Sequence, residues 1–248
     1  MRIKTAGVLF SAGFVALLSL SGAPASAQAD SPAGFYLRGD IGSGVAGRIV
    51  FRDANPTAAN CDLCNGTFPS PTAASALVDA GVGYRLTPYF RTELSVGYLI
   101  PASINGQTVN IPPAAGSAHF ASAFGLLNGY LDLDGLFPGQ FGPFQPYLSA
   151  SAGVARNHLG ITSGTSSLLG PFTLSSGDTT SFIWALGAGV GYPLSPSVTA
   201  DLGYHFMNLG ELRDGATLTF SGGPLALTRS KSDYFAVNAV TLGLRFGL

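Results

Sequence analysis

The stretch GFYLRGDIGSG, residues 34–44, carries two opposite charges two positions apart in an otherwise apolar, glycine-rich run. Successive side chains of a β-strand point to opposite faces, so Arg38 and Asp40 share one face while Leu37 and Ile41 share the other. A half-buried strand of a soluble protein has this pattern. So does a strand with lipid outside and a polar barrel lumen inside, and the rest of the chain distinguishes the two.

An export signal precedes this stretch. Two basic residues come before an apolar run at residues 7–20, and a small-residue Ala-Ser-Ala site ends at Ala27. We expect a cleaved secretory signal peptide over residues 1–27 and a mature domain over residues 28–248. A membrane-spanning helix is the less favoured interpretation because the apolar run is short.

The composition points to an all-β protein of the cell envelope. Mean hydropathy is positive at +0.34, yet after the signal no apolar stretch approaches the roughly 20 residues that a membrane helix needs. Glycines number 34, which favours closely approaching strands and tight turns. Without Arg2 and Lys4, 12 − 2 leaves 10 basic against 13 acidic side chains, a net charge of −3 with no basic run. Nucleic acid is therefore not an expected partner.

Alternating segments recur to the last residue. The eight predicted strands cover residues 34–44, 75–86, 89–99, 119–133, 146–156, 181–194, 197–206 and 238–248. The fourth has the weakest alternation, and there we place Asn128, Tyr130 and Asp132 on the inner side.

The connections alternate in length as well. Those at 46–74, 100–116, 157–179 and 208–233 are long, those at 87–88 and 194–197 are short, and 134–145 is intermediate. Short periplasmic turns and long extracellular loops are typical of outer-membrane barrels. We therefore predict an eight-stranded antiparallel up-and-down transmembrane β-barrel, closed because lipid leaves no partner for an open sheet edge.

A barrel of this size is just wide enough for side chains to fill its interior. The inner faces then carry a charge network, in which four arginines face four acids, so that nearly complete pairing is possible. The predicted lumen residues are Arg38, Asp40, Asp79, Arg85, Arg91, Glu93, Asp201, His205 and Arg245.

The sequence resembles the small outer-membrane β-barrel proteins of the opacity/porin type from Gram-negative bacteria, relatives of the OmpA-type barrel. The resemblance rests on FYLRGDIG, LLNGYLDL, PYLSASAGVA, the GVGY and LSP hairpin, DLGYHF and the terminal LGLRFGL. It implies an outer-membrane location among lipid and lipopolysaccharide, and assembly by the barrel-assembly machinery. The family usually ends in Phe or Tyr, whereas this chain ends in Leu248.

Two cysteines, Cys61 and Cys64, lie in the first long connection. In an exported chain we expect a loop disulfide, because the compartment is oxidising. A redox pair needs a thioredoxin-like context and a zinc site needs a second ligand pair, and neither is visible. No metal site and no cofactor are expected.

Three histidines, His119, His158 and His205, suggest an alternative, because some outer-membrane barrels are lipid-modifying enzymes with a Ser/His site near the lipid face. None of the three has a recognisable partner in the sequence. The outward aromatic residues are expected to be interfacial girdle residues. These are Tyr84, Trp184, Tyr192, Tyr204 and Phe246.

The expected function is that of a non-enzymatic, envelope-stabilising barrel whose surface loops are available for adhesion or for a partner that the sequence does not identify. A narrow channel for small solutes is the alternative, followed by a lipid-modifying enzyme.

Overall fold

The computed structural model describes residues 34–47, 49–53, 66–68, 74–108, 114–226, 230–232 and 234–248. The expected signal peptide and the two cysteines lie outside these ranges.

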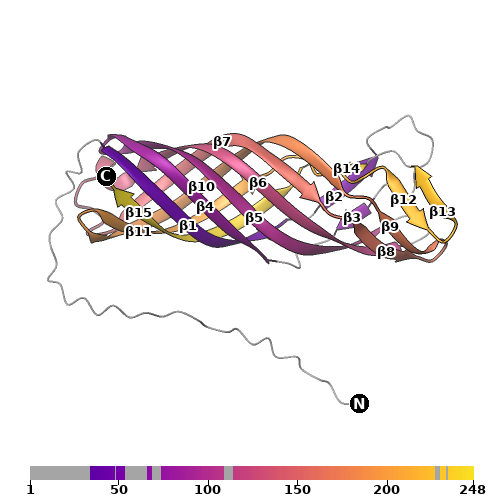
Figure 1. The fold of residues 1–248 in the computed structure, drawn as a ribbon. Helices are drawn as coiled ribbons and strands as arrows, with labels where there is room; N and C mark the ends of the chain where they lie inside the picture. Colours follow the sequence, from indigo (N-terminus) through magenta and orange to yellow (C-terminus); the bar gives the residue numbers. More distant parts are fainter. Residues whose placement is uncertain are drawn as a thin grey trace, which may run out of the picture.

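Eight long antiparallel strands form a closed barrel (Figure 1). They are β1 (Gly34–Ala46), β4 (Ala74–Thr87), β5 (Phe90–Thr108), β6 (Ala114–Asp132), β7 (Gln145–Leu159), β10 (Gly177–Ser195), β11 (Val198–Asn208) and β15 (Ala236–Gly247). Each pairs with the next in chain order, and β15 pairs with β1 from Tyr36↔Gly247 to Ala46↔Val237. That last pairing closes the barrel, as the sequence predicts.

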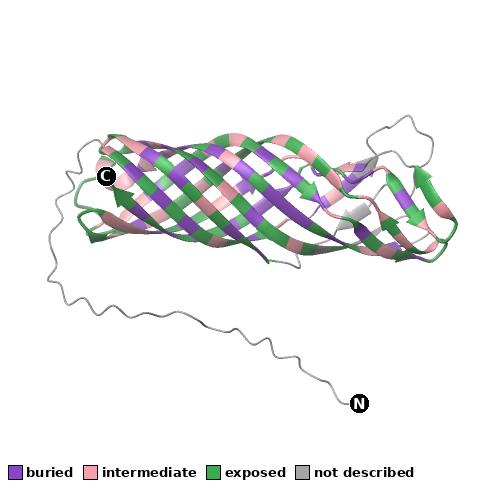
Figure 2. Ribbon diagram, in the orientation of Figure 1, coloured by how far each residue is buried: buried purple, intermediate pink, exposed green. Residues whose placement is uncertain are grey.

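Inner and outer side chains alternate along these strands, which appear as stripes of buried and exposed residues (Figure 2). In β1, Arg38 and Asp40 are buried while Leu37 and Ile41 are exposed on the outer surface. The outer face is apolar because it contacts lipid, and the inner face is free to be polar because other side chains surround it.

In the described ranges, seven short strands lengthen the barrel at one end, and we call them the extracellular extension. They are β2 (Ile49–Asp53), β3 (Gly66–Phe68), β8 (Thr162–Ser166), β9 (Gly170–Leu174), β12 (Thr217–Phe220), β13 (Gly223–Ala226) and β14 (Ser230–Ser232). All fall within the connections that the sequence indicates as loops, so much of that loop sequence is strand. The pattern missed them because a strand beyond the lipid needs no outward apolar row.

Tight connections close the opposite end, where the C-terminus also lies (Figure 1). Pro88 and Tyr89 turn β4 into β5, and residues 196–197 turn β10 into β11. The helix α1 (Leu133–Leu136) begins the connection from β6 to β7. The fourth strand therefore ends one residue earlier than predicted, at Asp132.

Glycines on the inner wall make room for large side chains from neighbouring strands. A Cβ at Gly83 would lie 2.1 Å from Cζ of Tyr36, and a Cβ at Gly97 would lie 2.3 Å from Cζ of Phe124. Contacts this short do not occur between real side chains. At these two positions the aromatic ring therefore occupies space that only a glycine on the neighbouring strand leaves free.

Candidate functional site in the barrel lumen

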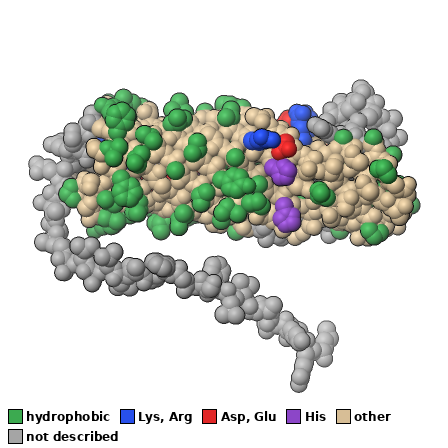
Figure 3. All heavy atoms as spheres, viewed as in Figure 1, with side chains coloured by type: hydrophobic (Ala, Val, Ile, Leu, Met, Phe, Trp, Pro, Cys, Tyr) green, Lys and Arg blue, Asp and Glu red, His purple; other side chains and the backbone are tan. Residues whose placement is uncertain are grey.

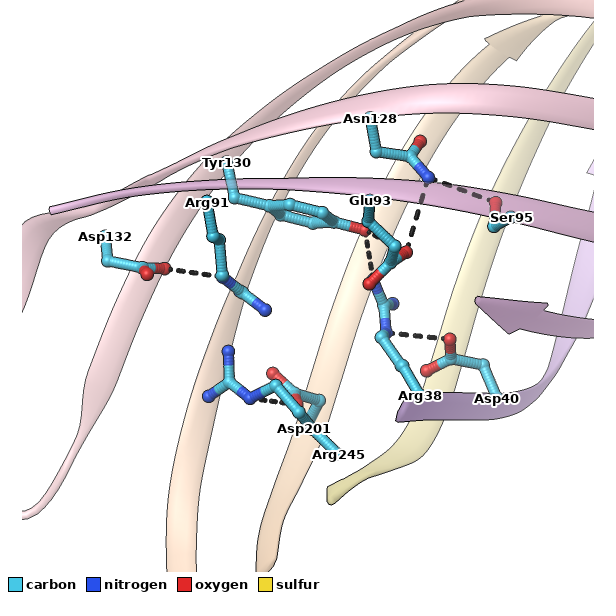
Figure 4. A network of polar contacts seen from close by, with 10 residues as sticks. All are labelled: Arg38, Asp40, Arg91, Glu93, Ser95, Asn128, Tyr130, Asp132, Asp201 and Arg245. Atoms are coloured by element: carbon cyan, nitrogen blue, oxygen red, sulfur yellow. Dashed lines mark hydrogen bonds and ion pairs between the residues drawn. The ribbon is translucent and has the colours of Figure 1, made fainter. Parts of the chain in front are cut away.

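The inner wall carries a connected group of polar side chains toward the periplasmic end, which we call the charged layer (Figure 4). Arg38 forms ion pairs with Asp40, at 2.8 Å from Nε to Oδ2, and with Glu93, at 3.6 Å from Nη1 to Oε1. It also contacts the hydroxyl of Tyr130. That hydroxyl donates a hydrogen bond of 2.9 Å to Glu93 Oε1. Residues of β1, β5 and β6 are thus joined across the lumen.

Asn128 extends the charged layer along the wall. Its Nδ2 donates to Glu93 Oε1 at 3.3 Å and to Ser95 Oγ at 3.0 Å. Asn128, Tyr130 and Asp132 are all buried, so the fourth strand presents to the lumen the side that the sequence indicated. These contacts meet at the carboxylate of Glu93, a residue that is 2% exposed.

Arg91 is fully buried at the centre of the charged layer. Its Nε donates to Oδ1 of Asp132 at 3.0 Å, and Arg85 approaches the other oxygen of that carboxylate at 3.7 Å. The Arg91 guanidinium lies 4.2 Å from the centre of the Tyr130 ring and 5.0 Å from that of Tyr147. Ring faces attract a cation, so these tyrosines partly replace its lost hydration.

Arg245 and Asp201 form a third group beside Arg91. Arg245 Nε lies 3.8 Å from Asp201 Oδ2, and Arg245 Nη2 donates to Gln145 Oε1 at 2.9 Å. Among the residues that the structure describes, none donates a hydrogen bond to either oxygen of the buried Asp201. The nearby arginine is therefore the main compensation for burying that charge.

The two remaining predicted lumen residues, Asp79 and His205, also face inward. Both line a cavity of about 40 Å³ that Arg38 and Asp40 border on one side. In the described ranges neither forms an ion pair within 4 Å. At roughly 10–15 Å³ per molecule the cavity has room for about three waters.

Outside the membrane-spanning strands, Asp134 in α1 lies close to the charged layer. Burial raises the pKa of its carboxyl above the usual range, and the neighbouring Asp132 carboxylate adds to the effect.

A second, apolar layer fills the lumen toward the extracellular end. Phe120 in β6 and Phe235, just before β15, come from opposite walls and meet with ring centres 4.4 Å apart. Leu99, Leu209 and Phe235 are each 0% exposed. The apolar layer consists of Ile49, Phe51, Leu77, Leu99, Ala118, Phe120, Phe124, Leu126, Ala155, Leu159, Ile183, Ala185, Met207, Leu209, Leu212, Phe235, Val237 and Ala239.

Polar contacts hold part of the apolar layer to the wall. Asn157 of β7 accepts a hydrogen bond from Ser122 at 2.8 Å and donates to the carbonyl oxygens of Leu209 at 2.7 Å and Glu211 at 3.1 Å. The sequence interpretation missed this layer, although Leu77 and Leu99 share the parity of the inward charges. An inward apolar residue is the signal that could have revealed it.

Two histidine pairs lie on the outer surface rather than in the lumen. Ser103 Oγ is 3.2 Å from His119 Nε2, and His158 Nδ1 is 3.0 Å from Asp178 Oδ1. The first pair is the kind that the enzyme alternative requires. No carboxylate in the described ranges hydrogen-bonds to His119, and the triad geometry that activates a serine needs such a third group.

The outward aromatic residues lie in two groups. Phe35 stacks edge-on with Tyr84 at 4.8 Å, and Phe144 packs with Tyr192 at 5.6 Å, both toward the periplasmic end. Trp184 packs with Phe206 at 5.7 Å farther up the barrel. In the part of the chain that the structure describes, no group of three or more His, Cys, Asp or Glu residues could hold a metal ion.

Residues 14–246 match the family described as "Outer membrane protein beta-barrel domain". An uncharacterized protein of Brucella suis biovar 1 is 32% identical over 254 residues, which cover 86% of this chain and 84% of the relative. The outer membrane protein PagN of Salmonella typhimurium is 24% identical over 204 residues, covering 75% and 79%.

Among solved structures, the outer membrane protein OprG from Pseudomonas aeruginosa aligns with a TM-score of 0.49 and 14% identity, covering 87% of this chain and 96% of its own. Neisserial surface protein A aligns with a TM-score of 0.45 and 17% identity, covering 88% and 99%. The sequence matches and the closed transmembrane barrel lead to one conclusion: the chain belongs to the outer membrane protein β-barrel domain family and is located in the bacterial outer membrane.

Proposed function

We propose that this protein is a closed, non-enzymatic barrel that stabilises the outer membrane and displays its extracellular extension to partners outside the cell. The observation that carries the proposal is the double filling of the lumen. The charged layer joins β1 to β5 and β6 across the lumen through Arg38, Glu93 and Tyr130. The apolar layer joins opposite walls through Phe120 and Phe235.

Two barriers in series argue against a solute path. An ion that crosses the apolar layer loses its hydration without gaining partners, which is strongly unfavourable. In the charged layer it must displace ion pairs that are already made. The remaining cavity of about 40 Å³ lies between these barriers and is lined by both kinds of side chain.

Single-channel recording in planar bilayers tests the closure. We expect the wild-type protein to show no steady conductance. Removing one barrier with Phe120→Ala and Phe235→Ala should still leave the bilayer sealed, because the charged layer remains below. Adding Arg38→Ala and Glu93→Ala should produce ion current. Retention of the folded form on an unboiled gel checks each variant, and steady conductance in the wild type would favour the narrow-channel alternative.

Lipid analysis tests the non-enzymatic part. Outer membranes from a deletion strain, with wild-type or Ser103→Ala protein restored, should have the same lipid composition, since no carboxylate in the described ranges hydrogen-bonds to His119 to orient it. A lipid species that appears only with the wild-type protein would establish an enzyme instead.

The display role depends on the extension. Replacing residues 162–174, which form the β8–β9 hairpin, with a short turn removes two strands that lie outside the eight-stranded barrel. We expect this variant to keep its folded form and to lose binding to host cells or phage particles that the wild type captures. If the variant captures them equally well, this hairpin is not the displayed surface.

A further inference from the structure

The charges that face the lumen of the eight-stranded barrel do not balance. Asp132 adds a fifth carboxylate to the four that the sequence indicated, and four arginines oppose them, so the net charge of the ionised side chains is −1 among the residues that the structure describes. The carboxylates are those of Asp40, Asp79, Glu93, Asp132 and Asp201, and the arginines are Arg38, Arg85, Arg91 and Arg245. An uncompensated charge inside a protein is strongly unfavourable. The lumen therefore lacks one positive charge.

Asp79 is the carboxylate without an arginine. Each of the other four lies within 4 Å of a guanidinium group, as Asp40 lies 2.8 Å from Arg38 (Figure 4). In the described ranges Asp79 forms no such pair. It lies directly opposite Asp40 where β4 pairs with β1, a position in which the two Cβ atoms are about 5 Å apart and like charges repel one another. The missing positive charge is therefore needed beside these two carboxylates.

The cavity of about 40 Å³ lies against both of them. Thr241 also lines it and is 4% exposed, yet in the described ranges its Oγ1 has no hydrogen-bond partner. This oxygen lies over Gly203, where no side chain covers it, since a Cβ at Gly203 would be 2.9 Å away. Oδ1 of Asp40, a residue that is 5% exposed, also has no hydrogen-bond partner among the described residues. Buried polar atoms without a partner in the protein point to a bound water or ion.

The ligands suit a monovalent cation. Carboxylate and hydroxyl oxygens are hard ligands, as alkali and alkaline-earth ions require. Calcium takes six to eight oxygen ligands, often from several carboxylates, and the described residues contain no group of three or more His, Cys, Asp or Glu residues that could hold a metal ion. A space with room for about three waters admits one small ion that keeps part of its hydration.

The outer wall of the barrel offers an ion no polar route to this cavity. On the face that Figure 3 shows, the side chains over the spanning strands are largely apolar, and the ionic side chains in view gather near the extracellular extension. Leu127, Val154 and Phe182, for example, are exposed on this wall. The charged and apolar layers lie at the two ends of the cavity. We therefore expect the ion to enter as the barrel folds and to exchange slowly afterwards.

We propose that the lumen cavity binds one monovalent cation of the size of sodium or potassium between Asp79 and Asp40, with Thr241 Oγ1 as a further ligand. The ion supplies the charge that the four arginines leave uncompensated. It is held in the folded barrel and is not conducted. The site is independent of the display role of the extracellular extension, so either proposal can fail without the other.

Refolding in different salts tests the proposal. The urea-unfolded protein is refolded into detergent at about pH 8, where an ordinary histidine is neutral, so that His205 adds no charge. Sodium, potassium and choline chloride are compared at equal ionic strength, and the thermal midpoint is read from the unboiled gel band. Sodium or potassium should raise the midpoint over choline by about 3–6 °C at ten times the apparent dissociation constant. Equal midpoints in all three salts would overturn the proposal.

Asp79→Asn separates the site from general salt effects, because it keeps the shape of the side chain and removes the charge. Its midpoint should be the same in sodium as in choline, and in choline it should exceed that of the wild type. Asp178→Asn removes an exposed carboxylate of the outer surface and should keep the full sodium response. A sodium response that survives Asp79→Asn would place the ion elsewhere. If Asp79→Asn is more stable in every salt and the wild type shows no preference, a proton neutralises Asp79 and the cation site is wrong.

Thr241→Val tests the third ligand, since it removes Oγ1 with little change in volume and none in charge. The sodium concentration that gives half of the stabilisation should rise at least threefold, while the midpoint in choline stays the same or rises. An unchanged half-effect concentration would contradict the site as assigned. Crystals grown with thallium(I), an anomalous scatterer that replaces potassium, locate the ion directly. We expect a peak in the cavity of the wild type and none in Asp79→Asn, and wild-type peaks confined to the outer surface would overturn the proposal.

Discussion

The charged and apolar layers fill neighbouring parts of one lumen with opposite chemistry. In the charged layer each group depends on named partners, as Arg38 depends on Asp40, Glu93 and Tyr130. In the apolar layer Phe120 and Phe235 need only shape and volume. A charge left alone in a dry interior loses most of its compensation, whereas an apolar side chain that loses a neighbour loses contact area. Substitutions should therefore affect the two layers differently.

The largest expected effect is in the charged layer. Asp40→Ala leaves the buried guanidinium of Arg38 without its 2.8 Å partner. We expect a loss of about 3–5 kcal/mol in the free energy of unfolding, as for other buried pairs broken on one side. Urea unfolding in detergent micelles measures it. A loss of about 1 kcal/mol or less would mean that water reaches the pair, and the layer would resemble an exposed surface.

The apolar layer should be somewhat more tolerant. Leu99→Ala removes a fully buried side chain that packs in the extracellular half of the lumen, with an expected loss of about 3 kcal/mol from lost transfer energy and the cavity left behind. Leu99→Met, which keeps most of the volume, is the control and should cost less than about 1.5 kcal/mol. The comparison fails if Leu99→Met is as damaging as Leu99→Ala.

A double-mutant cycle sharpens the contrast. Asp201→Leu leaves Arg245 unpaired, and adding Arg245→Met removes the stranded charge. The double variant should therefore be more stable than the sum of the two single losses predicts, by about 1–3 kcal/mol of coupling. Leu99→Ala combined with Phe235→Ala should show weaker coupling, because cavity effects are less specific. If the losses in unfolding free energy at Asp201 and Arg245 are simply additive, the two residues are not coupled, and the charged layer does not differ from the apolar layer in this respect.

The smallest effect belongs to the exposed pair of Arg156 and Asp178. Their side chains are 74% and 53% exposed, and the atoms are 3.9 Å apart. Asp178→Asn should change the lipid-free unfolding free energy by less than about 1 kcal/mol, because solvent screens such pairs. The same urea titration measures it. A larger loss would mean that this pair contributes as much to the free energy of unfolding as the buried pairs of the lumen, although it lies on the outer surface.

Much of this architecture follows from strand parity alone. The alternation around Arg38 and Asp40 indicates which side chains face inward, and eight such segments in a lipid environment require a closed barrel. All nine predicted lumen residues lie on the inner side, although Arg85, Asp79 and His205 are only partly buried. Cys61, Cys64 and the signal peptide lie outside the described residues, and their roles remain predictions.

Parity specifies a face but neither a height in the barrel nor the strand that stands opposite. The sequence by itself therefore determined the closed barrel, its apolar exterior and the set of inward charges. Only the tertiary structure decided that Glu93 meets Arg38 and Tyr130, and that Asp132 pairs with Arg91. The meeting of Phe120 with Phe235 across the lumen was decided there as well. The physical reason is that cross-lumen contacts depend on the register of every strand between the two residues, which no local pattern records.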